Sequence, residues 1–454
     1  MEDITMRKIF QYIMLAVVTI VMASCTSDIE ETTATTGKNN VQLVVGEFPA
    51  FGDSQTRAIG TPDEGKTSWA EGDELLLVID NTSYGSHSAT FTYNGKSWEL
   101  TSGELVYREG DPAYIPHVYY APNYKLANTS LMLKKGKAAG TDEYIEGKAR
   151  ITGNGETITV SFAETTRKYS RLRIATLPNE QITVDTEYFT PAGSSDMEQN
   201  GNYTLTSDEK GNAYLYGTFE NNSEVTVKYR EAALTTYTFS QATESAKSYA
   251  LDATVISANS AEEIKSAIEQ KVADGKTTIR LNLAPNAGTD EFMAIREAIK
   301  GAAPNDLGTI ELTIIGVETI PEEAFYKMLQ LKSVRMSDVK EIKKYAFKEC
   351  QYLTVVEAPS LNKLYSGVFK KCDQLSKLTF GPINYADARN WPIFEYITPN
   401  IDLILSDYQK EMIETDSYLY TANNDRDYAG SDEHNSKNFL GREFKSITCR
   451  YPVE

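Results

Sequence analysis

Apolar residues recur along the C-terminal part of the chain at a fixed spacing of 22 positions. Phe325, Phe347 and Phe369 are the largest of them. Four further columns keep the same spacing: Ile320, Ile342 and Leu364; Met328, Cys350 and Cys372; Leu331, Leu353 and Leu375; and Val334, Val356 and Leu378. A fixed period in this range is typical of a solenoid, in which each coil buries its apolar face against the next coil. The pattern predicts at least three such coils from Ile320 onward.

The same spacing explains the lone cysteine in the stretch EIKKYAFKECQYL. A neighbouring cation can activate a thiol as a nucleophile, and lysines flank Cys350. However, Cys350 stands in a column with a methionine and with Cys372, and free cysteine behaves as a small buried apolar residue. One coil of separation is also compatible with a disulfide between Cys350 and Cys372. With Cys449 the cysteines after Cys25 number three, an odd count, and we expect buried thiols.

The alternation within each coil predicts which residues face outward. If Val334 and Met336 point into the core, Ser333 and Arg335 point out. The equivalent outward positions in the other coils include Glu311, Thr313 and Ile315, then Val355 and Glu357, then Lys377 and Thr379. Repeat proteins bind ligands through this face, so Arg335, Glu357, Ser333, Thr379 and Lys377 are the candidate ligand-binding residues. A solvated sheet face without a ligand is the alternative.

Helical patterns precede the repeats. The segment SAEEIKSAIEQKVADG begins with a capping box and ends at Gly275, and DEFMAIREAIKG has the same apolar periodicity. The strand TTIRLNL lies between them. Beyond Ile383 the columns are no longer recognisable, and NIDLILS and GREFKSITC are expected to form an irregular terminal cap. Residues 258–454 are therefore expected to form one capped repeat domain of α/β type.

Between Val41 and Ser257 apolar and polar residues alternate with a period of two, which predicts β-strands. Turn dipeptides at Asn94-Gly95, Asn154-Gly155 and Asn221-Asn222 indicate hairpins. This spacing of strands is typical of antiparallel β-sandwiches. We expect two of them, at residues 41–175 and 176–257, with a break at Pro178. The whole chain should be a mainly β, multidomain protein.

The N-terminus has the pattern of an export signal. Arg7 and Lys8 precede the apolar run Ile9–Met22, which is too short to span a bilayer. The run ends in Met22-Ala23-Ser24-Cys25, which resembles the bacterial lipoprotein cleavage box. That resemblance implies cleavage before Cys25 and lipidation of its sulfur, with residues 1–25 as the signal peptide. A plain signal peptide is the alternative.

Residues 26–40 contain almost no apolar side chains, so they are expected to form a flexible tether. Within them Ser27-Asp28-Ile29-Glu30-Glu31 resembles the acidic signal that sends lipoproteins of the Bacteroidota to the cell surface. The resemblance implies a protein anchored by lipid in the outer membrane and facing outward. A merely solvated acidic linker is the alternative.

Charge and composition exclude several function classes. The 454-residue chain has a net charge of -19, which argues against a nucleic-acid partner. Its three histidines lie far apart, and no zinc spacing, nucleophile elbow or phosphate-binding glycine loop is present. We therefore expect no metal, no cofactor and no enzymatic activity. A glycan hydrolase is a further class, but no pair of carboxylates stands out to support it.

Two short motifs in the β-rich part resemble the fimbrillin-like lipoproteins of the Bacteroidota. Thr56-Arg57-Ala58 is followed by Trp69-Ala70-Glu71-Gly72-Asp73, and Tyr119-Tyr120-Ala121-Pro122 comes later. The resemblance implies two transthyretin-like sandwiches. In polymerising members a protease cuts after an arginine near the first strand, and a neighbouring subunit's strand then completes the sheet. Arg57 is placed for such processing, although it is equally an ordinary loop residue.

The repeat pattern IxxxAFxxCxxLxxV is similar to the BspA-like type of leucine-rich repeat found on bacterial surfaces. Together the two resemblances imply an adhesin, a fimbrial subunit in the body or at the tip of the fibre, whose repeats bind a host or bacterial ligand. Other fimbrial subunits would then be partners. The alternative is a non-polymerising surface lipoprotein that binds a glycan or a protein.

Overall fold

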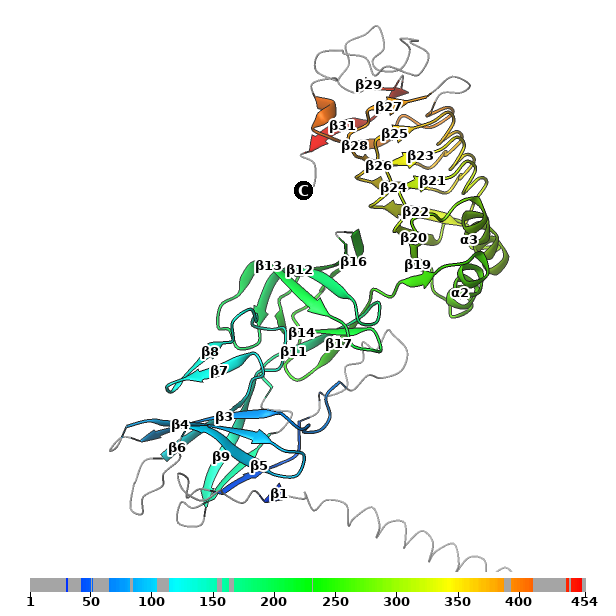
Figure 1. Cartoon of the computed structure of the whole chain (residues 1–454). Coiled ribbons are helices and arrows are strands. Elements are labelled where there is room, and N and C mark those ends of the chain that lie inside the picture. Colours follow the sequence, from blue (N-terminus) through cyan, green and yellow to red (C-terminus); the bar gives the residue numbers. More distant parts are fainter. Residues whose placement is uncertain are drawn as a thin grey trace, which may run out of the picture. The chain divides into compact units, whose positions relative to one another are not determined.

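The computed structural model describes the chain outside its N-terminal segment and several loops. The described residues are 30–31, 42–49, 51, 65–81, 85–103, 114–152, 157–162, 167–230, 232–387, 393–410, 438–440 and 442–450. The chain divides into two compact units. The first contains Met1–Thr226 with Tyr237–Asp252, and the second contains Val227–Thr236 with Ala253–Glu454. Each unit is mainly β (Figure 1).

The first large sheet has the strand order β1-β2-β10-β9-β6-β3-β4-β5. Its strands are β1 (Glu30–Glu31), β2 (Gln42–Val45), β3 (Glu74–Asn81), β4 (His87–Tyr93), β5 (Trp98–Gly103), β6 (Tyr114–Tyr120), β9 (Ile145–Thr152) and β10 (Thr157–Ser161). Most pairs are antiparallel, as predicted, but β2 and β10 run parallel. A separate hairpin is formed by β7 (Tyr124–Ala127) and β8 (Ser130–Leu133). The core of this sheet is rich in aromatic residues, including Trp98 and Phe91.

The second large sheet has the order β16-β15-β12-β14-β11-β17, with β13 paired to β12. Its strands are β11 (Ser170–Ala175), β12 (Gln181–Pro191), β13 (Glu198–Thr206), β14 (Asn212–Phe219), β15 (Glu224–Tyr229), β16 (Ala232–Thr238) and β17 (Ser248–Asp252). Because β11 pairs with β14 and β17, the two sheets divide between Ser161 and Ser170. This division lies before residue 175, where the sequence places it.

Two of the predicted turns have different outcomes. At Asn94-Gly95 the expected hairpin joins β4 to β5, with Tyr93 paired to Trp98. Gly95 adopts a φ of +88°, a conformation that suits glycine. At Asn221-Asn222 the chain turns, but β14 and β15 are not paired, because β12 lies between them in the sheet. A local turn signal identifies a change of direction and not the partner strand. Asn154-Gly155 lies outside the described residues.

The second unit is built on a parallel sheet with the order β18-β19-β20-β22-β24-β26-β28-β31. Its strands are β18 (Ile256–Ala258), β19 (Thr278–Leu283), β20 (Ile310–Ile315), β22 (Leu331–Met336), β24 (Val355–Ala358), β26 (Lys377–Phe380), β28 (Asp402–Ser406) and β31 (Ser446–Arg450). Ser333 pairs with Val355, and Val355 with Lys377, so the register equals the predicted period. Figure 1 shows these strands stacked in chain order.

A second, narrow parallel sheet runs beside the first, one short strand per coil. It consists of β21 (Thr319–Ile320), β23 (Glu341–Ile342), β25 (Lys363–Leu364) and β27 (Tyr385–Ala386). The loss of the columns after Ile383 predicted an irregular cap there. That expectation is wrong in part, because β27 continues the narrow sheet, and β28 and β31 continue the wide one.

The phenylalanine column is fully buried and stacked. Phe325 and Phe347 have ring centroids 5.1 Å apart, and Phe347 and Phe369 are 5.7 Å apart, with nearly parallel rings. Phe394 extends the column by one more coil at 5.9 Å from Phe369. Its spacing in the sequence is 25 rather than 22, which is why the column seemed to end. Phe292 packs edge-on against Phe325 at the first end of the column.

Two helices close the N-terminal end of the stack. Helix α2 (Ala261–Ala273) starts at Ser260, whose side chain accepts a hydrogen bond from the Glu263 amide, and it buries Ile264 and Ile268. Helix α3 (Thr289–Ala302) buries Phe292, Ile295 and Ile299 among others. Both helices and their buried faces were predicted from the sequence. On α3, Arg296 Nη1 donates to the Glu323 carbonyl at 2.8 Å, and Lys300 Nζ donates to the Tyr326 carbonyl at 3.3 Å.

Candidate functional site

The exposed face of the wide sheet brings the predicted ligand-binding residues together. We call this surface the strand face and define it by Ser333, Arg335, Glu357, Lys377 and Thr379. They lie in two rows, because Ser333, Val355 and Lys377 are register partners, and so are Arg335, Glu357 and Thr379. All five side chains are partly exposed. The alternation read from the sequence therefore places them on one surface.

Charges on the strand face pair between neighbouring coils. Arg335 Nε lies 3.0 Å from Glu357 Oε2, and Lys377 Nζ lies 3.2 Å from Glu357 Oε1. The three side chains form a row of alternating charge, with Arg335 42 % exposed and Lys377 43 % exposed. Such exposed pairs contribute little to stability, about 0–1 kcal/mol each. Their cations remain accessible to an incoming ligand that offers carboxylates or hydroxyls.

Two of the three expected outward positions on β20 are not available, while Glu311 is exposed as predicted, with 44 % of its side chain accessible. Thr313 is only 4 % exposed and Ile315 only 2 % exposed, so both predictions of exposure are wrong. Arg280, the register partner of Thr313 on β19, is also buried, and its Nε donates to the Leu234 carbonyl at 2.6 Å. Leu234 belongs to the short segment 227–236 that groups with the second unit. Apart from Glu311, the accessible outward residues therefore begin at β22.

Cys350 is packed and not reactive. It and Cys372 are fully buried free thiols. Cys350 Sγ donates to the Phe325 carbonyl, and Cys372 Sγ donates to the Phe347 carbonyl, each at 3.0 Å. Burial raises the pKa of the Cys350 thiol to about 12, which keeps it protonated. Each thiol thus hydrogen-bonds to the preceding coil, a role that the column pattern alone did not reveal.

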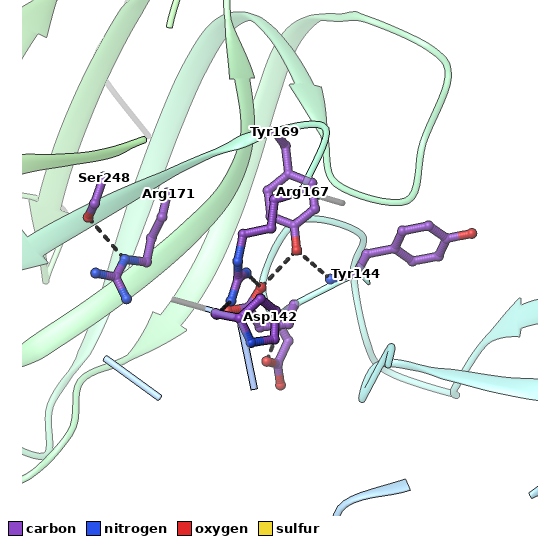
Figure 2. Close-up of polar contacts among 8 residues, drawn as sticks. Asp142, Tyr144, Arg167, Tyr169, Arg171 and Ser248 are labelled. Atoms are coloured by element: carbon purple, nitrogen blue, oxygen red, sulfur yellow. Dashed lines mark hydrogen bonds and ion pairs between the residues drawn. The ribbon is translucent and has the colours of Figure 1, made fainter. Parts of the chain in front are cut away.

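The first unit contains a buried polar cluster that the sequence did not single out (Figure 2). Arg167 pairs with Glu143 inside the protein and donates from Nη2 to the Pro49 carbonyl at 2.7 Å. Tyr169 donates its hydroxyl to Glu143 at 2.7 Å and accepts the Tyr144 amide at 3.0 Å. Burial, and then the negative charge of Glu143, raise the pKa of Tyr169 well above its usual value. We call these residues the Arg167 cluster.

The Arg167 cluster contacts Pro49 and Phe51, which follow β2 in the chain. The guanidinium of Arg167 lies 3.8 Å from the ring centroid of Phe51, and that of Arg171 lies 4.6 Å from the same ring. Arg171 in turn donates to Ser248 on β17 at 3.0 Å. The only signal in the sequence is that Arg167, Tyr169 and Arg171 occur at every second position. Nothing in the sequence indicates that Glu143 is the partner.

The motif Trp69-Ala70-Glu71-Gly72-Asp73 has a local structural role. Asp73 accepts hydrogen bonds from the Ala70 amide at 2.7 Å and from the Tyr120 hydroxyl at 3.1 Å, and it pairs with Lys66 at 2.8 Å. Trp69 Nε1 donates to the Gly46 carbonyl at 2.8 Å. These contacts join the start of β3 to β2 and β6. The motif therefore fixes strands of the first sheet.

The remaining sequence-based sites cannot be placed. Cys25 and Arg57 lie outside the described residues. Within the described ranges, no group of three His, Cys, Asp or Glu side chains is arranged to hold a metal ion. No helix in the described part of the chain has the length and apolar character needed to traverse a bilayer.

Comparisons with known proteins identify the repeats. Residues 306–412 match the family model of the BspA type leucine rich repeat region, in six copies. These residues therefore form a leucine-rich-repeat region of that type, as the sequence pattern indicated. No curated protein matches the chain.

Two solved structures show limited similarity. A leucine rich repeat protein of T. pallidum is 20 % identical with a TM-score of 0.19, over 22 % of this chain and 49 % of that one. The chain thus spans about half the length of that protein. A putative cell adhesion protein from Bacteroides fragilis is 10 % identical with a TM-score of 0.25, over 50 % of this chain and 93 % of that one.

Proposed function

We propose that the protein is a surface adhesin whose leucine-rich repeats bind a host or bacterial ligand through the strand face. The observation that carries this proposal is the accessible row of Arg335, Glu357 and Lys377 on adjacent coils. Leucine-rich repeats use their parallel strands as a regular binding surface. Because the three charges lie on rigid, hydrogen-bonded strands, a ligand would order few side chains on binding, which favours affinity.

The proposal includes a lipid anchor and a fimbrial context. Cleavage before Cys25 and acylation of its thiol would hold the protein on the outer membrane. Residues 26–40 would be the tether, but the prediction that they are flexible throughout is wrong in part, because Glu30–Glu31 form β1 and pair with β2. The two large sheets of the first unit are then two transthyretin-like sandwiches, and the repeats are a capped solenoid. Processing at Arg57 would prepare the first sandwich to receive a strand from another fimbrial subunit.

The strand face can be tested with a matched pair of double variants. Arg335→Ala with Glu357→Ala removes the central ion pair and should abolish most cell adhesion while the fold stays intact. Lys340→Ala with Glu318→Ala removes a similarly exposed pair between adjacent coils, 2.6 Å apart, away from the strand face. This control should adhere like the unmodified protein. Full adhesion by the first variant, or equal loss in both, contradicts the proposal.

The anchor and the fimbrial role have separate tests. Cys25→Ala should abolish palmitate labelling and release the protein from the membrane fraction. Arg57→Ala should abolish heat-stable polymers if the protein assembles into fimbriae. Absence of polymers from the unmodified protein would favour the alternative, a non-polymerising lipoprotein that captures a glycan or a protein. Hydrolysis of a polysaccharide would instead indicate an enzyme.

A further inference from the structure

A second candidate site is a cavity in the first unit. Its volume is about 580 Å³, within the range of about 300–1,000 Å³ that is usual for small-molecule sites. One wall is the segment from Gly136 to Asp142, and the other walls come from β13 and from Tyr214 and Tyr216 on β14. The Tyr216 amide donates to the Gly140 carbonyl at 2.7 Å, which joins two of the walls.

Two nearly buried polar groups in this cavity have no hydrogen-bond partner among the residues that the structure describes. Tyr216 is only 8 % exposed, and its hydroxyl forms no hydrogen bond within the described residues. The hydroxyl is not among the fully enclosed polar atoms of the described residues, and Tyr216 is one of the residues that line the cavity. Asn123 is 3 % exposed, and its amide nitrogen donates to the Ala138 carbonyl and the Thr141 hydroxyl. Its Oδ1 acceptor is left for another donor.

The charges lining the cavity balance. Asp142 contributes a carboxylate whose one hydrogen bond from a described residue comes from the neighbouring Glu143 amide, to Oδ1, and Lys137 contributes one cation. Burial raises the pKa of Asp142, and burial together with Glu143 and Asp142 raises the pKa of Tyr216 well above its usual value. An anionic ligand would be repelled by Asp142, and a cationic ligand would be repelled by Lys137. The lining therefore suits a neutral ligand with many hydroxyl groups.

We propose that this cavity binds a neutral sugar residue, as found at the end of a glycan chain. A pyranose ring has an apolar C–H face, which can pack on an aromatic ring such as that of Tyr214. Its rim of hydroxyls both donates and accepts, which matches Tyr216, Asn123 Oδ1 and Asp142. Thr204 and Thr206 on β13 add hydroxyls at the mouth of the cavity. The site is independent of the strand face.

The test is titration of the full-length chain in detergent with neutral monosaccharides, namely galactose, glucose, mannose, fucose and N-acetylglucosamine. At least one should bind. Tyr216→Phe removes only the free hydroxyl, so it should keep the melting temperature and weaken binding about fivefold to tenfold, the effect of one hydrogen bond. Asp142→Asn keeps the acceptor for the Glu143 amide and should weaken binding similarly.

Controls make each outcome decisive. Tyr188→Phe alters an exposed tyrosine that does not line the cavity and should bind sugar normally. Thr204→Val, at an exposed position, serves as a second variant if Tyr216→Phe is poorly folded. The proposal is overturned if no sugar binds, if Tyr216→Phe and Asp142→Asn bind as well as the unmodified chain, or if free lysine binds in place of sugar. Sugar binding that persists in Arg335→Ala with Glu357→Ala separates this site from the strand face.

Discussion

The two units differ in how far along the chain a residue finds its neighbours. In the repeats, Ser333 lies beside Val355, and Val355 beside Lys377, always one period away. In the first sheet some consecutive strands pair, but β2 pairs with β10, so that Thr157 lies opposite Gln42, and β3 pairs with β6. In a periodic sequence the period itself predicts which residues are in contact, since each coil packs on a similar coil. In a non-periodic sheet no such rule exists, because pairing depends on the whole chain.

The difference extends to what holds each unit together. The repeat core is a continuous apolar column in which no single polar contact dominates. The first unit places an ion pair, Arg167 with Glu143, in its interior beside the N-terminal segment. The first kind of core is stabilised by transfer of apolar surface from water. The core of the first unit depends on the geometry of this buried ion pair, so the loss of either partner should destabilise it.

The largest effect is expected from Phe347→Ala in the middle of the stack. Removing a ring that contacts both neighbouring coils should cost about 3–5 kcal/mol of unfolding free energy. Because each coil is stabilised by the next, the whole second unit should melt earlier, while the first unit keeps its transition. Calorimetry that resolves the two transitions measures this. A variant with both transitions unchanged would show that the stacked column does not carry the stability of the repeats.

Arg167→Met should destabilise the other unit. It leaves the Glu143 carboxylate buried with only the Tyr169 hydroxyl as a described side-chain partner, at a cost of about 3 kcal/mol. The variant with both Arg167→Met and Glu143→Leu should recover much of that loss, since no buried charge remains. The first unit's transition in the same calorimetric scan reports both results. Equal stability of the single and double variants would mean that the ion pair is not the sensitive element.

Cys350 probes the repeat core at a smaller scale. Cys350→Ala removes a buried sulfur and its hydrogen bond to the Phe325 carbonyl, which should cost about 1–2 kcal/mol. Cys350→Ser retains a donor and a similar shape, so its loss should be smaller. Urea titration of the second unit distinguishes the two. If serine were worse than alanine, the thiol would act through its apolar character alone.

The same residue predicts a pH dependence. Burial raises the Cys350 pKa from an ordinary value of 9.0 to about 12, so the unfolded thiol ionises first as pH rises. The contribution of the protonated Cys350 thiol to the unfolding free energy is fully present below pH 9 and is lost as pH increases toward 12. Between these values it should fall by about 1.4 kcal/mol per pH unit. The difference in stability between the unmodified protein and Cys350→Ser, measured from pH 8 to 11, should follow this slope.

The smallest effect is expected on the strand face. Arg335→Ala removes one exposed partner of Glu357 and should change the unfolding free energy by no more than about 1 kcal/mol. Lys377 continues to neutralise Glu357 at 3.2 Å. A binding defect together with normal melting would place function, and not stability, in these charges. A large loss of stability would instead show that the row of charges supports the sheet.

The sequence predicts the repeat unit in detail because its chemistry is repeated. The columns at Phe347 and Cys350, the outward positions of Arg335 and Glu357, and both capping helices are all present. The prediction failed where the period changed, since Phe394 follows Phe369 by 25 residues. It also failed at Thr313, whose burial depends on a neighbouring strand and not on its own alternation.

In the first unit the sequence predicts strands but not their partners. The hairpin at Gly95 is local, so it is recognisable. The pairing of β10 with β2 and the position of β11 in the second sheet depend on distant segments. The cavity at Tyr216 is formed where residues 136–142, β13 and β14 meet, so no local pattern in the sequence predicts it. Its residues acquire a shared role only in the folded chain.

Along the turns that carry the phenylalanine column, the backbone amides of one coil donate to carbonyls of the next coil, so the two ends of this ladder are unlike. The amides of Phe325 and Lys327 donate to the carbonyls of Ala346 and Lys348 in the next coil. The Tyr326 carbonyl has no earlier coil to receive from, and Lys300 of α3 donates to it instead. Because the coils between the two ends make equivalent contacts with their neighbours, whole periods can be inserted or deleted between the ends. The length of the strand face is therefore adjustable in steps of one strand spacing, about 4.8 Å, without altering either end.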